Sequence, residues 1–151
     1  MIRMTVGAML AGAFLTAWDV PMEVQMTNVQ PAHWAWDLQT LPGWVPDWLG
    51  GPLFHGMPLS NWIGWYVTGV LISRIMLAIV PPTKWASTVA PFALPLVLYA
   101  TNGIMPIATT ARHGYWLAAV GGIVAMGVPL VLGIRARRRA IGMPASVPVP
   151  G

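Results

Sequence analysis

Four apolar runs, separated by polar or proline-rich segments, divide the chain. A hydrocarbon core about 30 Å thick needs roughly 20 apolar residues per helix, and each run is close to this length. The runs predict membrane helices over about residues 4–20, 61–80, 85–107 and 115–134. The last run contains no charged residue and is the clearest of the four. The pattern therefore predicts an all-α, polytopic membrane protein with about four transmembrane helices.

The first and third runs carry signals that end or bend a helix. Arg3 and the small residues at 11–13 also resemble a secretory signal sequence; we interpret the first run as a short membrane helix with Asp19 at its far end. Because proline removes a backbone donor, we expect the third helix to be kinked or locally broken. Its prolines are Pro91, Pro95 and Pro106.

Basic residues gather at one end of these predicted helices. Four arginines lie between residues 135 and 139, whereas the outer loop over 21–59 has no lysine or arginine. Since cytoplasmic loops are enriched in these residues, we expect both termini to be cytoplasmic, in a cytoplasmic or photosynthetic inner membrane. We expect a single domain over residues 1–140, followed by a proline-rich tail over 141–151.

The composition supports a membrane protein and excludes several kinds of site. The 151 residues are 56% hydrophobic and 8% charged, whereas a soluble domain carries about 25% charged residues. There is no cysteine, which excludes disulfides and thiolate sites. The net charge of +4 reports orientation, so no nucleic-acid partner is expected. The three histidines lack helical spacing, so no metal site is predicted. They are His33, His55 and His113.

The outer loop is rich in tryptophan. Six of the nine tryptophans lie between residues 34 and 65, and such residues favour the headgroup layer of a membrane. One interpretation is an aromatic belt that anchors the protein. The other is a groove for a long apolar ligand or lipid, lined by rings from this region and from the first helix. The rings assigned to this groove are Trp18, Trp34, Trp36, Trp62 and Trp65.

Three motifs resemble the integral-membrane carotenoid biosynthesis proteins, which include the carotenoid hydratases. They are LTAWDV at Leu15–Val20, the pair Trp34 and Trp36, and PLSNWIGW at Pro58–Trp65. The resemblance is best over residues 15–80 and is to the C-terminal part of longer relatives. It implies an all-helical membrane fold with a carotenoid substrate or ligand. Where relatives commonly have an Asp-Pro pair, this chain has Glu23 and Val24.

Hydration of a carotene double bond needs an acid, a stabilised cation and a placed water, but no cofactor. A carboxylic acid in an apolar site can hold its proton at neutral pH, which makes Asp19 the first candidate acid and Glu23 the second. Ser60 and Asn61 can hold the water. The cation can be stabilised by the ring of Trp18, Trp62 or Trp65. Alternatively, the acids are solvated or hydrogen-bonded interface residues, and Ser60 or Asn61 is a helix N-cap.

Two functions of different classes follow. The first is a non-catalytic accessory subunit of a larger pigment–protein complex, such as a photosynthetic reaction centre or antenna, with lipids and other membrane subunits as partners. The second is an active carotenoid hydratase, a lyase, or one half of a split enzyme. A small unrelated transporter subunit is a third interpretation. Whether the chain is an enzyme stays open, with the accessory role favoured.

Overall fold

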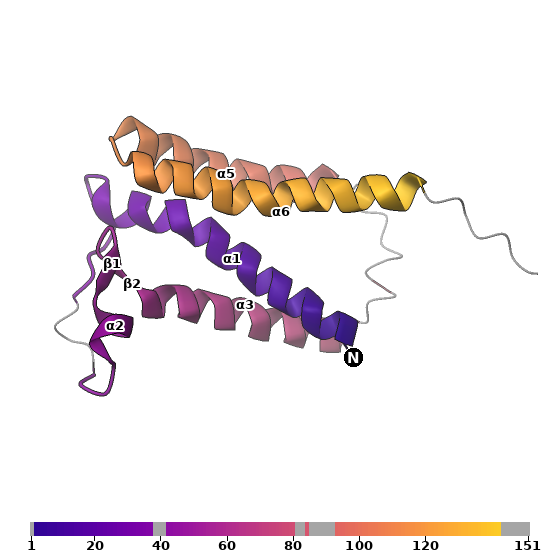
Figure 1. Cartoon of the computed structure of the whole chain (residues 1–151), viewed down its shortest axis with the longest axis horizontal. Coiled ribbons are helices and arrows are strands. Elements are labelled where there is room, and N and C mark those ends of the chain that lie inside the picture. Colours follow the sequence, from indigo (N-terminus) through magenta and orange to yellow (C-terminus); the bar gives the residue numbers. More distant parts are fainter. Residues whose placement is uncertain (1, 38–41, 81–83, 85–92, 143–151) are drawn as a thin grey trace, which may run out of the picture.

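The computed structural model describes residues 2–37, 42–80, 84 and 93–142. The described residues are mostly helical, so the predicted all-α fold is confirmed, with the addition of a small β-hairpin (Figure 1). The elements are α1 (Ile2–Asn28), α2 (Asp47–Gly50), β1 (Pro52–Phe54), β2 (Met57–Pro58), α3 (Leu59–Ile79), α5 (Ala93–Arg112) and α6 (Trp116–Gly142).

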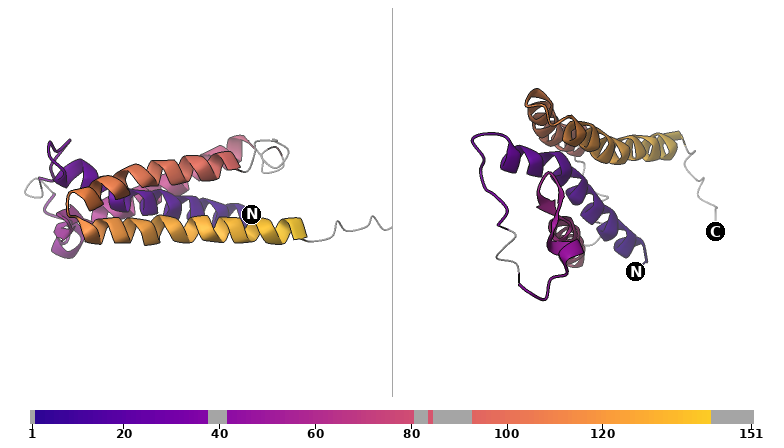
Figure 2. Two further views of the ribbon diagram at one scale, coloured as in Figure 1. Left: turned by 90° about the horizontal axis from the view of Figure 1, so that it is seen from above. Right: turned by 60° about the vertical axis from the view of Figure 1, so that its left-hand side comes forward.

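The long helix α1 occupies the centre of the molecule. It packs against α3 on one side and against the α5–α6 pair on the other, and α5 and α6 run side by side in opposite directions (Figures 1 and 2). The start of α1 and the end of α6 lie at one end, while α2 and the β1–β2 hairpin lie at the other (Figure 1). The basic residues lie in the last turns of α6. They are therefore at the same end of the molecule as the start of α1, as the sequence predicts. The side of the membrane that this end faces stays a prediction.

Three helices of the described residues are long and apolar enough to cross a membrane. They cover Met4–Asn28, Leu59–Ile79 and Trp116–Arg135. The helix α5 lies alongside α6 and has 20 residues, but it is not apolar enough to be counted with these three. Its asparagine, threonines and prolines lower its mean hydropathy. The expected start of this fourth crossing, at 85–92, lies outside the described residues.

The first helix is longer than the sequence predicts. We expected it to end near residue 20, before Pro21, but α1 continues to Asn28. Pro21 is buried, and a Cβ added to Gly122 of α6 would lie 2.7 Å from its Cβ. Packing against α6 therefore supports the interrupted turn, as neighbouring helices do for membrane prolines. The connecting segment accordingly begins at Val29 instead of residue 21.

Other boundaries also differ from those expected. The last helix runs through the basic residues to Gly142, so the arginines belong to its final turns and do not follow it. The helix α5 continues through Pro106 to Arg112 without a break. Of the predicted proline-rich tail, residues 141 and 142 belong to α6, and residues 143–151 lie outside the described part of the chain.

Two glycines bring the backbones of α1 and α3 together. A Cβ on Gly69 would lie 2.7 Å from the Cα of Gly12, and a Cβ on Gly12 would lie 2.7 Å from the carbonyl oxygen of Tyr66. Small residues allow such close approach between membrane helices, where packing is a major driving force. This contact sets the distance at which side chains from α3 reach α1.

Replacing Gly69 by alanine should destabilise the protein. The added methyl group must push α3 away from Gly12 or strain the backbone, which costs about 1–3 kcal/mol of unfolding free energy. Thermal unfolding of the purified protein in detergent measures the change. Gly64→Ala is the matched control, because Gly64 lies on the same helix with nothing within 4 Å of an added Cβ. Equal stability of the two variants would contradict the close helix contact.

Candidate functional site

Two carboxylates are buried within α1. Asp19 is 0% exposed and Glu23 is 2% exposed. Residues four apart lie on one face of an α-helix, one turn from each other, and the two groups interact electrostatically. Both lie inside a helix long and apolar enough to span a membrane. The acids are therefore buried and not solvated. The alternative that they are hydrogen-bonded interface residues stays open, because both accept hydrogen bonds.

Asp19 is held by the first turn of α3. The Nδ2 atom of Asn61 donates a hydrogen bond to Oδ2 of Asp19 at 2.8 Å and lies 2.9 Å from the sulfur of Met57. The N-cap position of α3 is Pro58, which makes no side-chain capping bond. The N-cap interpretation of Ser60 and Asn61 is therefore wrong, since the helix starts before them. The Oδ1 atom of Asp19 is buried and has no hydrogen-bond partner among the described residues.

Glu23 is held by the tryptophan-rich segment after α1. The indole N–H groups of Trp34 and Trp36 both donate to Oε1 of Glu23, at 3.0 and 2.7 Å. Two donors to one oxygen stabilise the charged form of a carboxylate. The segment therefore folds back onto α1 at these two positions. Trp44 and Trp48, in contrast, are 80% and 70% exposed and fit the predicted aromatic belt.

A pocket of about 480 Å³ opens beside the two acids. Its wall includes Asn61 and Trp36, and each of these side chains donates a hydrogen bond to one of the carboxylates. Ser60 and Trp65 also line the pocket. The carboxylates therefore lie one side chain behind the wall. We call this cavity the acid pocket.

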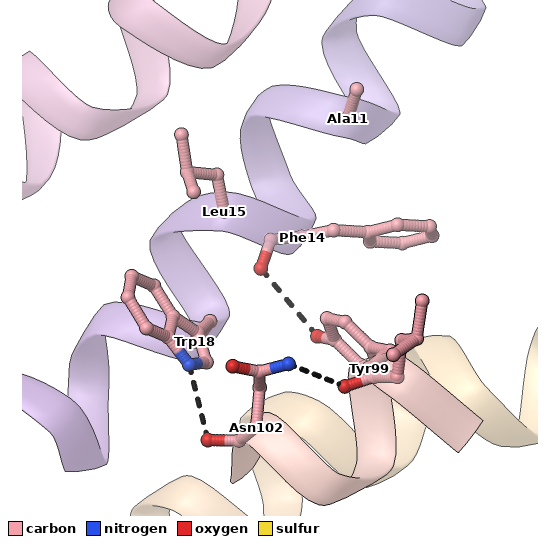
Figure 3. A pocket seen from close by; sticks show the side chains of 7 residues that line it. Ala11, Phe14, Leu15, Trp18, Tyr99 and Asn102 are labelled. Atoms are coloured by element: carbon pink, nitrogen blue, oxygen red, sulfur yellow. Dashed lines mark hydrogen bonds between the residues drawn. The ribbon is translucent and has the colours of Figure 1, made fainter. Parts of the chain in front are cut away.

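The aromatic rings predicted near the acids divide into two groups. The rings of Trp18 and Trp65 meet edge-to-face, with centroids 6.5 Å apart at 87°. The indole N–H of Trp18 donates to the carbonyl oxygen of Asn102 on α5 at 3.2 Å (Figure 3). Trp62 packs instead against Phe54 of β1, with centroids 5.7 Å apart. The structure therefore brings Trp18 and Trp65 together and directs Trp62 toward the hairpin.

Sequence reasoning missed some polar residues that shape the site. Asn102 and Tyr99 lie within an apolar run, and a polar side chain in such a run is a recognisable sign of function or helix contact. Met57 carries no such sign, because its contact with Asn61 arises only when β2 lies at the start of α3. The sequence indicated Trp34 and Trp36, the donors to Glu23, as residues of a groove for an apolar ligand. It did not predict their contact with an acid.

Residues 1–129 match the family model described as carotenoid biosynthesis protein. The chain belongs to this family. The match covers most of the chain and extends beyond residues 15–80, where the motifs are concentrated, so family membership includes the α5–α6 pair as well. Comparison with curated proteins and with solved structures gave no match. The family relationship connects the chain to carotenoid biosynthesis and leaves the reaction to be argued from the site.

Replacing Asn61 by leucine should destabilise the protein. Leucine has a similar size but no donor, so Asp19 would keep its burial and lose the hydrogen bond, at a cost of about 1–3 kcal/mol. The measurement is thermal unfolding in detergent. Thr68→Val is the control, because it removes a polar group from an exposed position on the same helix. If both variants unfold at the same temperature as the wild type, the hydrogen bond between Asn61 and Asp19 does not form in solution.

Proposed function

We propose that this chain is a membrane enzyme of carotenoid biosynthesis that adds water to the terminal double bond of a linear carotene. The observation that carries the proposal is the buried pair of carboxylates on one face of α1. An ionisable group inside a membrane segment is costly and is usually retained for function. A helix that only anchors the protein in the membrane does not need two buried ionisable groups beside a pocket.

The surroundings of the two acids differ in a way that suits acid catalysis. Two buried negative charges one turn apart repel each other, and a single proton shared by the pair removes most of this cost. Glu23 has two indole donors at one oxygen. Asp19 has one amide donor and a buried oxygen without a partner among the described residues. We therefore place the proton on Asp19.

The reaction then needs only the residues around the acid pocket. With the side chain of Asn61 turned aside, the Asp19 proton passes to the less substituted carbon of the terminal double bond. The electron pair of the double bond forms the new C–H bond, which leaves a tertiary cation on the other carbon. The ring faces of Trp18 and Trp65 and the charge of Glu23 stabilise this cation. A water held by Ser60 or Asn61 attacks the cation and returns a proton to Asp19. Water is the only co-reactant.

Replacing Asp19 by asparagine should abolish hydration, because the amide keeps the shape of the side chain but cannot donate a proton to carbon. We expect at least about a hundredfold loss of product, the size of a general acid contribution. The assay is chromatography of hydroxylated carotenoids from a host that makes the linear precursor. The control is Asp47→Asn, at an exposed position in α2. Unchanged product in the Asp19 variant would overturn the assignment.

An accessory subunit of a pigment–protein complex is the second candidate. The observation that favours it is the extent of apolar surface on the outer helices. Large side chains of α3 are 45–59% exposed along its length, at Ile63, Val67, Leu71 and Ile75. Lipid can cover this surface, and so can the helices of neighbouring subunits. If the chain is an accessory subunit, the acids and tryptophans serve only to hold α1 against α3, and carotenoid or lipid fills the pockets.

Mild detergent extraction separates the two candidates. An accessory subunit should migrate with a much larger pigmented particle, because its apolar faces are buried against partner chains. An enzyme that works alone should migrate as a small particle that contains this chain, detergent and lipid. The measurement is native gel electrophoresis with detection of this chain and of pigment absorbance. Finding the chain only in small particles would exclude the accessory role.

A further inference from the structure

A second cavity system lies on the other side of Trp18, between α1 and α5. Two pockets, of about 410 and 390 Å³, follow one another along these helices and share Trp18 and Asn102 in their walls. Figure 3 shows the first of them. On α1 their lining runs from Ala11 to Gln25. The hydrogen bond between Trp18 and Asn102 lies where the two pockets meet, and we call the pair of pockets the α1–α5 groove. It is separate from the acid pocket, whose lining comes from α3 and from Trp36.

The lining of the α1–α5 groove follows the axis of α1. Its α1 residues recur at helical spacing, so they form one stripe parallel to the helix axis. From Ala11 to Gln25 the helix rises about 21 Å, at roughly 1.5 Å per residue. A groove of this shape along a membrane helix suits an extended chain better than a compact ligand. The α1 stripe consists of Ala11, Phe14, Leu15, Trp18, Met22 and Gln25.

The polar atoms around the middle of the groove are turned onto the helix backbones. The N–H of Trp18 donates to the carbonyl oxygen of Asn102, and the side-chain amide of Asn102 donates to the carbonyl oxygen of Leu98 at 2.7 Å. The hydroxyl of Tyr99 donates to the carbonyl oxygen of Phe14 at 3.5 Å (Figure 3). In the first pocket, aromatic rings and aliphatic carbons therefore make up most of the surface that meets a ligand, whereas Gln25 and Thr101 add polar side chains to the second. A hydrocarbon needs no hydrogen bonds and fits such a surface.

We propose that the α1–α5 groove binds the conjugated chain of a linear carotene. What happens at the end of that chain rests on the proposed function, in which this end is hydrated. A conjugated chain is already rigid and straight, so it loses little conformational entropy on binding, whereas a saturated acyl chain must be ordered. The rings of Phe14, Trp18 and Tyr99 offer flat surfaces to a flat polyene. Both features favour a carotene over a lipid tail.

The groove runs along α1 past the position of Asp19. Asp19 lies between Trp18 and Met22 in the sequence, and its side chain points roughly 100° round α1 from that of Trp18. Trp18 stands between the groove and the α3 side, where its ring meets Trp65 at the acid pocket. A carotene held in the groove therefore needs to turn only its end round Trp18 to reach the acids. The groove holds the chain, and the acid pocket takes the end.

A pair of alanine variants tests the groove. Ala11→Phe places a ring in the groove and should weaken carotene binding about tenfold or more, since overfilling a packed site costs about 1–3 kcal/mol. Ala13→Phe is the matched control, because Ala13 is exposed on the same helix and does not line the groove. The probe is a linear acyclic carotene, titrated into purified protein in detergent. Binding is measured from tryptophan fluorescence quenching and from the visible absorbance that co-elutes with the protein.

The outcomes separate the groove from the reaction. Loss of binding in Ala11→Phe alone, with an unchanged unfolding temperature, supports the groove. Equal binding by the two variants overturns it. Displacement of the carotene by an equimolar saturated-chain phospholipid also overturns it, because the occupant is then a lipid. Binding is independent of the acid, so a groove confirmed by Ala11→Phe together with full activity of Asp19→Asn would reject only the proposed reaction.

Discussion

The burial of two carboxylates in one membrane-spanning helix is the constraint on which the rest of the structure depends. Asp19 and Glu23 cannot be left in an apolar interior without donors, and α1 itself has none to offer, because its backbone N–H groups are used within the helix. The donors come from Asn61 on α3 and from Trp34 and Trp36 in the connecting segment. This requirement places the start of α3 against α1 and folds the tryptophan segment back across its end.

The central helix presents different chemistry on different faces. Toward α3 it carries Gly12 and the two acids, so a close backbone contact and a polar cluster share one side. Toward α5 it carries the apolar stripe of the α1–α5 groove. Toward α6 it carries Pro21, which fits against Gly122. A single helix therefore connects the acid pocket to the groove, and Trp18 lies at the boundary between them.

In the function that we propose for this member of the carotenoid biosynthesis family, these faces serve a common purpose. A linear carotene is long and apolar, with its reactive double bond at the end, so an enzyme that acts on it needs a binding surface for the chain and a separate place for the chemistry. The groove and the acid pocket provide two such places. The pairing of Trp18 with Trp65 keeps them adjacent without merging them. The same division would also suit a protein that only stores a carotenoid, and the buried carboxylates are our reason for proposing an enzyme.

The sequence by itself determined the membrane fold, the family and the identity of the acids, because apolar run length, the clustering of basic residues and local motifs are properties of neighbouring positions. It also indicated Asn61 and Trp36 as site residues, but not their roles. The continuation of α1 through Pro21, which packs against Gly122 about a hundred residues away, appeared only in the structure. The pairing of Asn61 with Asp19, the two indoles on Glu23 and the division between groove and pocket were decided only by the tertiary structure. Each of these contacts joins segments that are distant in the sequence or separated by a loop, and no periodicity records such a contact.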